Sequence, residues 1–496
     1  MATGKYVKQL AGESIVYGIS GTISRFIGFF LMPVYTRMFM PAEYGVIALV
    51  DTVTTLMSIL VVLGLDHSSA RWFYDTKDAE HRKCTIASWF WCQLTIATLA
   101  GTILFVLARQ VSFLLVQSEQ YAPLVRFAAL GLPLSTFAKV IGNWLRYQRR
   151  AWTATFFFTA SSLATIVCTI LFVVFLRWGL SGVFSARLVA AAITAGVAIP
   201  LIKGWITPAC FSMAHLKPML LFGLPFVPAG IAHWVKISSS RLVLNVFCGN
   251  AEVGLYAIAA SLASPVGLFS NAFQLAWAPF AYSILHETDS GKVYAKVLDV
   301  YAFCSTVLCT AVSLFAVPLL SILTTRDYYS ASSCVPFLAY AFVFNGVLYV
   351  ANLGSGIAKK SLPAATGVFL EAIAALSLSF VLVPWLGKEG AAAAVAVSSL
   401  LNVVYLFHAS QKNYFIPYRF WPALTCFGFS WLLIAVDHWA IPGSRLQTYA
   451  IRGFLLLLFL PLGVLLGVVP WRRLVLGIRH ISSKYCAVHA PARKVR

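Results

Sequence analysis

Long apolar runs of about 20 residues or more, separated by short polar breaks, fill almost the whole chain. An α-helix needs about 20 apolar residues to cross a bilayer, whereas the strands of a membrane barrel would show alternating segments of about ten residues, and these are absent. The pattern therefore predicts about fourteen transmembrane helices. They are expected at 12–36, 45–65, 85–108, 121–145, 152–176, 180–202, 218–246, 253–285, 297–323, 331–357, 363–386, 390–410, 420–440 and 448–470.

Composition supports this interpretation. Of 496 residues, 60% are hydrophobic and only 11% are charged, and the mean hydropathy is +0.83. Soluble domains contain about 45–50% apolar and about 25% charged residues, so a soluble protein is excluded. We expect an all-α polytopic membrane protein with no sizeable domain outside the membrane. The apolar run behind Lys5 and Lys8 is longer than a signal-peptide core, so it is interpreted as a retained first span.

Basic residues are distributed unevenly between the two sides of the predicted bundle. The loops and termini on one side carry 24 Lys and Arg residues, and those on the other carry 6. Because cytoplasmic loops hold the excess of Lys and Arg, both termini are predicted to be cytoplasmic. The formal net charge of +21 is then explained by loops and a tail beside an anionic leaflet, without nucleic-acid binding.

A short repeat indicates that the chain contains two related halves. Pro41–Ala48, at the start of the second span, matches Asn250–Ala257, at the start of the eighth, in four of eight positions. An even number of spans separates the copies, so both halves would have the same orientation. We expect an N-terminal lobe at 1–210, a C-terminal lobe at 211–412, two further spans at 413–471 and a basic cytoplasmic tail at 472–496.

Three basic residues, Arg25, Lys139 and Lys236, lie deep in predicted spans, where a charge costs about 2.5–3.5 kcal/mol. Each belongs to a helical stripe of polar or small residues, and Arg241 flanks the stripe of Lys236. Such stripes line water-filled cavities or pack helix interfaces. If the cations face one central cavity, it would select an anionic, phosphorylated ligand.

Other polar residues inside the spans leave alternatives open. Asp51 and Glu371 are candidates for a proton or cation site, or are counter-ions of the buried bases. Neutral side chains could bind sugar hydroxyls or join helices; they are Asn143, Asn271, Gln274, Asn345 and Asn352. No nucleotide-binding, dinucleotide or metalloprotease motif occurs in the sequence, so we expect no cofactor, no metal ligand and no catalytic residue.

Several ordered motifs are typical of one transporter family. They are Tyr17-Gly18, Ser24–Phe29, Leu31–Arg37, Pro41–Gly45, Gly64–Asp66, Arg71–Tyr74 and Phe273–Phe280. With them, the chain resembles the polysaccharide transporter family, the Wzx-type flippases of lipid-linked oligosaccharides in the multidrug/oligosaccharidyl-lipid/polysaccharide superfamily.

The resemblance implies two six-helix lobes facing one another in a V, as in MATE transporters, plus two C-terminal helices, around a cationic lumen that opens alternately to each side. Ser24–Phe29 is similar to a Ser-Arg-x-x-Gly-Phe run of the lipid II flippases, which nominates Arg25 as a pyrophosphate contact. Lys139, Lys236 and Arg241 are added from their stripes. The implied cargo is an undecaprenyl-pyrophosphate glycan, moved across a bacterial inner membrane for O-antigen, lipopolysaccharide or exopolysaccharide synthesis, with membrane lipids and polymerase or export machinery as partners.

Two other functions are weighed against the flippase. A multidrug or cation antiporter of the MATE type would need carboxylates to outnumber cations in its cavity, and only Asp51, Asp299 and Glu371 are available. A glycan polymerase or ligase would present a large outside loop, yet the loops at 109–120 and 441–447 are short. The chain is therefore expected to be a transporter and not an enzyme, driven by the membrane potential or by ion exchange.

Overall fold

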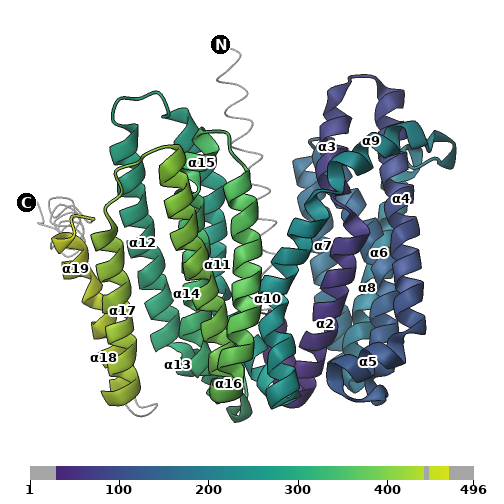
Figure 1. Ribbon diagram of the computed structural model, residues 1–496. Helices are drawn as coiled ribbons and strands as arrows, with labels where there is room; N and C mark the ends of the chain where they lie inside the picture. The colour runs from purple at the N-terminus through teal and green to yellow at the C-terminus, as the bar shows by residue number, and fades with distance from the viewer. Residues whose placement is uncertain (1–29, 441–445, 469–496) are drawn as a thin grey trace, which may run out of the picture.

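A computed structural model describes residues 30–440 and 446–468, and within these ranges the chain is helical without a strand. Two groups of helices stand side by side in Figure 1, with α10 between them. The first contains α2 (Pro41–Val62), α3 (Leu65–Asp75), α4 (Ala79–Val106), α5 (Ala108–Val116), α6 (Ala122–Tyr147), α7 (Ala151–Thr169) and α8 (Gly179–Ile202). The second contains α11 (Asn250–Ser283), α12 (Ser290–Leu314), α13 (Ala316–Leu323), α14 (Val335–Ala351), α15 (Leu353–Ile357) and α16 (Leu362–Asn413).

The remaining helices join or flank these two lobes. A bent pair, α9 (Met213–Gly223) and α10 (Phe226–Cys248), turns by 48° and crosses from one lobe to the other, because α9 packs on α3 and α4 while α10 packs on α16. The C-terminal helices α17 (Phe420–Ala440), α18 (Leu446–Leu457) and α19 (Phe459–Leu465) lie at the outer side of the second lobe, where α17 and α18 contact α12.

Local sequence explains where the helices begin and end. At the start of α2, Pro41 occupies the first helical turn, where a missing N–H costs nothing, and the Glu43 carboxylate accepts a hydrogen bond from the Met40 N–H at 2.9 Å. The helix ends at Leu63 and Gly64, both in the left-handed region. α4 begins after Asp78, whose carboxylate accepts from the His81 N–H.

The 52-residue helix α16 consists of two antiparallel arms. Its backbone is non-helical at Gly387, where φ is +57°. Ser399 and Asn402 both donate hydrogen bonds to Glu371, about 30 positions away, which a continuous helix would place some 45 Å apart. The two arms match the spans predicted at 363–386 and 390–410.

Eleven helices in the described part of the chain are long and apolar enough to cross a membrane, and the bent pair α9–α10 makes twelve. With α16 counted as two arms, the described helices correspond to the predicted spans 2 to 14. The first predicted span lies almost entirely outside the described residues, so the total of fourteen is not confirmed. The all-helical membrane fold is confirmed.

The two copies of the sequence repeat pack against each other where the lobes meet. A Cβ atom added to Gly45 would overlap the backbone oxygen of Asn250, and one added to Gly254 would overlap the oxygen of Pro41. α2 and α11 therefore touch backbone to backbone at their first turns, in a reciprocal contact. Because only glycine lacks a Cβ, this approach explains why both copies keep that residue.

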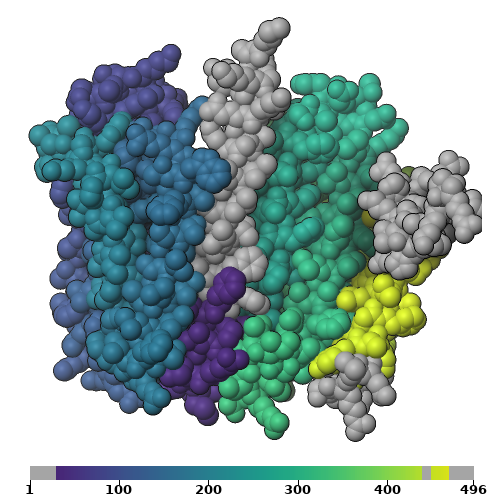
Figure 2. Space-filling view, turned by 180° about the vertical axis from the view of Figure 1, so that it is seen from behind, coloured from purple at the N-terminus to yellow at the C-terminus, as the bar shows by residue number. Residues whose placement is uncertain are grey.

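A second contact joins the lobes at the same end. The helical segment 30–38 lies beside the second lobe, as the purple and green atoms at the lower end of Figure 2 show. Thr36 donates to the Leu323 oxygen at 3.2 Å, and the buried Tyr328 hydroxyl donates to the Phe39 oxygen at 2.8 Å. The lobes are thus held together at the ends of α2 and α11 where these helices begin.

Candidate functional site

A buried ion pair lies at the centre of the second lobe. Lys236 on α10 and Glu371 on the first arm of α16 are 2.7 Å apart, and their side chains are only 8% and 2% exposed. The Lys236 ammonium also donates to the Asn345 Oδ1 atom on α14 at 2.7 Å. Ser399 and Asn402, on the second arm of α16, donate to the two carboxylate oxygens at 2.6 and 2.7 Å. Burial of both charges is tolerated because each is paired and hydrogen-bonded.

A pocket of about 380 Å³ adjoins this pair. Helices α10, α11 and α14 supply nearly all of its described lining, which includes Lys236, Arg241, His233, Ser270, Asn271 and Asn345. We call it the cationic pocket. Its basic side chains all come from α10, whereas its amides come from α11 and α14.

Arg241 is a basic residue of this pocket that has hydrogen-bonding capacity left for a ligand. Its guanidinium lies 6.0 Å from the centre of the Tyr256 ring, and its Nε atom is buried without a hydrogen-bond partner in the described part of the chain. Since the charge of Lys236 is balanced by Glu371, Arg241 leaves the described lining with one uncompensated positive charge. A guanidinium in this situation can bind a phosphate through two parallel hydrogen bonds.

The amides of the cationic pocket are held by their own helices. The Nδ2 atom of Asn271 donates to the Gly267 oxygen at 2.7 Å, and that of Asn345 donates to the Ala341 oxygen at 2.8 Å. Each amide is therefore fixed in orientation, and its carbonyl oxygen remains available as an acceptor. Asn345 uses that oxygen to bind Lys236.

A second pocket, of about 360 Å³, continues along α11 and shares Tyr349 with the first. Gln274 and Asn352 line it, together with Trp277, Tyr282 and the start of α15. We call it the amide–aromatic pocket. The sequence-predicted Asn271, Gln274, Asn345 and Asn352 thus fall on two adjoining pockets.

The predicted basic residue of the first lobe has a different environment. Lys139 on α6 is half-exposed and forms an ion pair of 2.9 Å with Asp66 on α3. Gln93 donates to the other oxygen of Asp66 at 3.2 Å. Asn143, one helical turn beyond Lys139, is half-buried on α6. These side chains lie in the first lobe and do not line either described pocket.

Asp51 on α2 is paired with Arg187 on α8 through two contacts, at 2.5 and 3.3 Å. Both side chains are more than one-third exposed, at 38% and 35%. Arg187 also lies over the Phe184 ring. In this structure Asp51 is thus the counter-ion of Arg187, and Glu371 is the counter-ion of Lys236. Arg25 lies outside the described residues.

Sequence reasoning missed several partners of these charges. Asp66 was noted only as part of a motif, and Ser399 and Asn402 were not singled out. The sequence held one signal for Ser399 and Asn402. They are three residues apart, so they lie on the same face of a helix, and this face of the second arm of α16 contacts the first arm. No group of three or more His, Cys, Asp or Glu residues in the described ranges could hold a metal ion.

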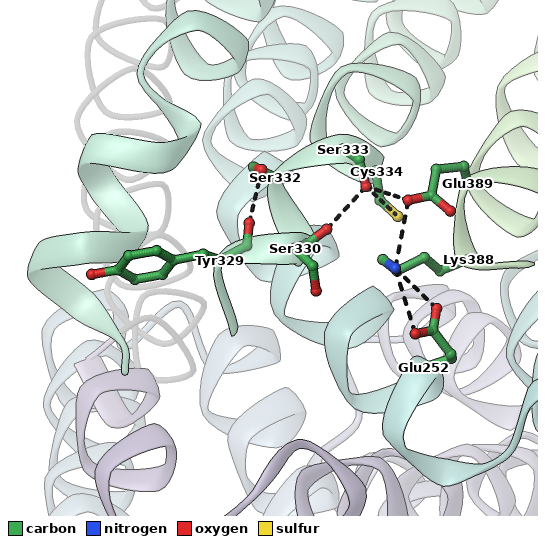
Figure 3. A network of polar contacts seen from close by, with 8 residues as sticks. All are labelled: Glu252, Tyr329, Ser330, Ser332, Ser333, Cys334, Lys388 and Glu389. Carbon is green, nitrogen blue, oxygen red and sulfur yellow. Dashed lines mark hydrogen bonds and ion pairs between the residues drawn. The ribbon is translucent and has the colours of Figure 1, made fainter. Parts of the chain in front are cut away.

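A further polar network secures the turn of α16 and was also not anticipated (Figure 3). Lys388, directly after the non-helical Gly387, lies 3.1 Å from Glu252 on α11 and 3.5 Å from Glu389. Ser333, in the 3₁₀ segment η5 (Arg326–Cys334), donates to Glu389 at 2.5 Å. The network binds the turn to the first turn of α11, so it fixes the second lobe beside the Gly45–Gly254 contact.

Comparisons with known proteins agree with this architecture. The described fold is similar to that of a solved lipid II flippase, MurJ in an inward closed conformation, with a TM-score of 0.75 and 13% identity over 93% of this chain and 100% of that one. A multidrug resistance MATE family transporter of the MOP superfamily, in an inward-facing conformation, gives a TM-score of 0.65 and 14% identity over 80% of this chain and 97% of that one. At these identities the likeness establishes the fold, with its two lobes.

Two relatives are similar in sequence. The succinoglycan biosynthesis transport protein ExoT of Rhizobium meliloti (strain 1021) is 25% identical over 52% of this chain, and the match spans half of that protein's length. The Lsg locus putative protein 1 of Haemophilus influenzae is 22% identical over 60% of this chain and 71% of its own length. A family model described as "polysaccharide biosynthesis protein" matches residues 34–333, and a match over more than half of the chain shows that it belongs to this family of membrane transporters.

Proposed function

We propose that the protein translocates a polyprenyl-pyrophosphate-linked oligosaccharide from the cytoplasmic to the periplasmic leaflet of a bacterial inner membrane. The observation that carries this proposal is the cationic pocket, in which Arg241 remains uncompensated beside the buried Lys236–Glu371 pair. The pyrophosphate of this cargo is esterified at both ends and carries two negative charges at neutral pH, so a cation in a low-dielectric site attracts it strongly.

The names of two similar proteins support the same proposal. One is named a succinoglycan biosynthesis transport protein, and the structurally similar flippase acts on lipid II. A lipid-linked glycan combines the features that these names and the pocket share: an anionic linker, a sugar portion and an apolar tail. In the proposed complex, Arg241 and the sequence-predicted Arg25 bind the pyrophosphate, while the polyprenyl tail stays in the lipid.

Alternating access would follow from the two-lobe architecture. The lobes meet where α2 and α11 begin, so opening that end requires the Gly45–Gly254 contact to separate. A ligand drives such a change only through different contacts in the two states. Lys236 is suited to respond, because a bound pyrophosphate in the neighbouring pocket would compete with Glu371 for its ammonium.

In this proposal the termini lie on the cytoplasmic side, as the distribution of Lys and Arg predicts, and the ends of α11 and α14 near α15 then face the cytoplasm. A cationic drug fits less well, because the described lining of the cationic pocket carries Lys236 and Arg241 and no carboxylate. This favours a flippase over an antiporter of cationic drugs.

The experiment is to delete the gene in its host and to label the glycan with a membrane-impermeant probe in intact spheroplasts. We expect the lipid-linked glycan to accumulate in the inner leaflet, and we expect the wild type to restore labelling while Arg25→Ala and Arg241→Ala fail to do so at equal membrane levels. Gly131→Ala is a matched control, because nothing lies within 4 Å of an added Cβ there. Unchanged labelling in the deletion strain, with no second flippase in the genome, would refute the proposal.

A further inference from the structure

The amide–aromatic pocket differs in chemistry from the cationic pocket beside it. Its described lining contains no charged side chain; polar groups come from Gln274, Asn352 and Tyr282, and Trp277 and Tyr349 add aromatic surface. Its volume of about 360 Å³ lies in the range of small-molecule sites, about 300–1,000 Å³. Aromatic rings beside amides provide an apolar face together with hydrogen-bonding groups, which is the character of a sugar ring.

One polar atom in this pocket has no partner among the described residues. The Oδ1 atom of Asn352 is buried and accepts no hydrogen bond from residues 30–440 or 446–468. A buried acceptor without a donor costs about 1–3 kcal/mol, so a site that keeps one is suited to a ligand that donates a hydroxyl or amide proton. Asn352 ends α14, directly before α15, where its backbone is held by a hydrogen bond to the Leu348 oxygen.

The aromatic part of the pocket is preorganised. Trp277 is almost fully buried and donates from its indole nitrogen to the Tyr349 oxygen at 3.1 Å. Phe273 stacks on it with ring centres 5.7 Å apart. Because this side chain is fixed before binding, ordering it costs a ligand nothing.

Tyr282, unlike Trp277, is exposed, with 48% of its surface accessible to solvent. Its hydroxyl lies so close to Gly356 on α15 that a Cβ atom at this glycine would overlap it. The glycine therefore allows the tyrosine to lie across the pocket rim, and a larger residue at 356 would displace it.

The two pockets are consecutive along one helix. Asn271 lines the cationic pocket and Gln274 lines the amide–aromatic pocket, three residues and about 4.5 Å further along α11. The second pocket lies toward the α15 end of the molecule, which is the upper end in Figure 1 and the side where the basic loops are expected. A ligand whose anionic group occupies the first pocket can thus extend an attached group into the second.

We propose that the amide–aromatic pocket is a glycan subsite that binds an uncharged sugar ring adjoining the pyrophosphate, with Asn352 accepting a hydrogen bond from it and Tyr282 contacting its face. The proposal rests on the proposed function, since the pyrophosphate sets the position of the sugar. It adds that the binding free energy of the cargo has two separable contributions: the cationic pocket binds the charge, and the amide–aromatic pocket binds the sugar.

The test measures binding to the purified full-length protein in nanodiscs. Two probes are used: undecaprenyl pyrophosphate without sugar, and the lipid-linked repeat unit extracted from the host. Because the sugar-free lipid can carry one more negative charge at its terminal phosphate, each variant is compared with the wild type for the same probe. Asn352→Ala and Gly356→Ala should each weaken its binding about 3- to 10-fold, the effect of one buried hydrogen bond or contact, and should leave the affinity for the sugar-free lipid unchanged. Gly131→Ala should alter neither.

Other outcomes overturn the proposal in distinguishable ways. Equal losses for both probes in Asn352→Ala and Gly356→Ala would show that the pocket does not distinguish sugar. If both variants bind both probes as the wild type does, the sugar does not bind in this pocket, and the proposed flippase function is unaffected. If the wild type binds neither lipid, the proposed function fails together with the subsite.

Discussion

The buried pair of Lys236 and Glu371 gives the sharpest test of the electrostatics of the second lobe. Glu371→Gln keeps the shape of the side chain and an oxygen that can accept from Ser399, but removes the negative charge 2.7 Å from the Lys236 ammonium. Removing one partner of a buried ion pair costs about 3–5 kcal/mol, because the other charge is left uncompensated. The side chains of Lys236 and Glu371 are only 8% and 2% exposed, so solvent hardly screens either charge and this range applies.

The double variant Lys236→Met/Glu371→Gln separates the charge from the packing. Both charges are absent. The glutamine keeps one oxygen, which can accept from Ser399, and its NH2 group can donate to the Asn402 Oδ1 atom once the Asn402 amide turns over. Replacing a buried pair by neutral groups of similar volume is often neutral or stabilising, so we expect the double variant to lie within about 1–2 kcal/mol of the wild type. The coupling between the two positions should then be about 4 kcal/mol or more, above the range of about 0.5–3 kcal/mol that is usual for contacting residues.

The assay is the thermal unfolding of the purified protein in detergent, followed by tryptophan fluorescence, for the wild type, both single variants and the double variant. Glu371→Gln should melt at a clearly lower temperature, and the added Lys236→Met change should restore most of the loss. If Glu371→Gln melts with the wild type, then Lys236 is not held as an uncompensated charge, and the reasoning from burial is wrong. Glycan export by the stable double variant would further show that transport does not need this pair.

Two other predictions follow from the lobe interface and from the first lobe. Gly45→Val should push the first turn of α2 away from the Asn250 oxygen, at an overpacking cost of about 1–3 kcal/mol, and should widen the distance between spin labels placed on the two lobes at this end; Gly131→Ala, in open space, should leave it unchanged. Asp51→Asn should lower stability by less than about 1 kcal/mol, because its pair with Arg187 is more than one-third exposed. A fall in melting temperature as large as that of Glu371→Gln would contradict this difference.

The helices themselves could be predicted from the sequence because each is encoded locally. Hydrophobic length determined the spans, including the two arms of α16 on either side of Gly387. The repeat at Gly45 and Gly254 was likewise visible as a local motif, and the structure shows that the copies contact one another.

The partners of the buried charges could not be predicted in the same way. Helical periodicity indicates which face of α10 carries Lys236, but the neighbour that meets this face depends on how whole helices pack. Asp51 and Glu371 were considered as counter-ions of the buried bases, yet Lys139 binds Asp66, in the first turn of α3. Asp51 binds Arg187, 136 positions away in the chain. Sequence spacing carries no information on such contacts.

The reciprocal contact of Gly45 and Gly254 has the form of an isologous dimer interface contained within one polypeptide. A homodimer would have to carry the same residue at both equivalent positions, whereas two covalently joined copies can diverge. The glutamates of the repeat illustrate this freedom. Glu43 caps its own helix by accepting from the Met40 N–H, while Glu252, at the same place in the other copy, binds Lys388 at the turn of α16. Because both copies lie in one polypeptide, a residue can change its contacts in one lobe without the same change in the other.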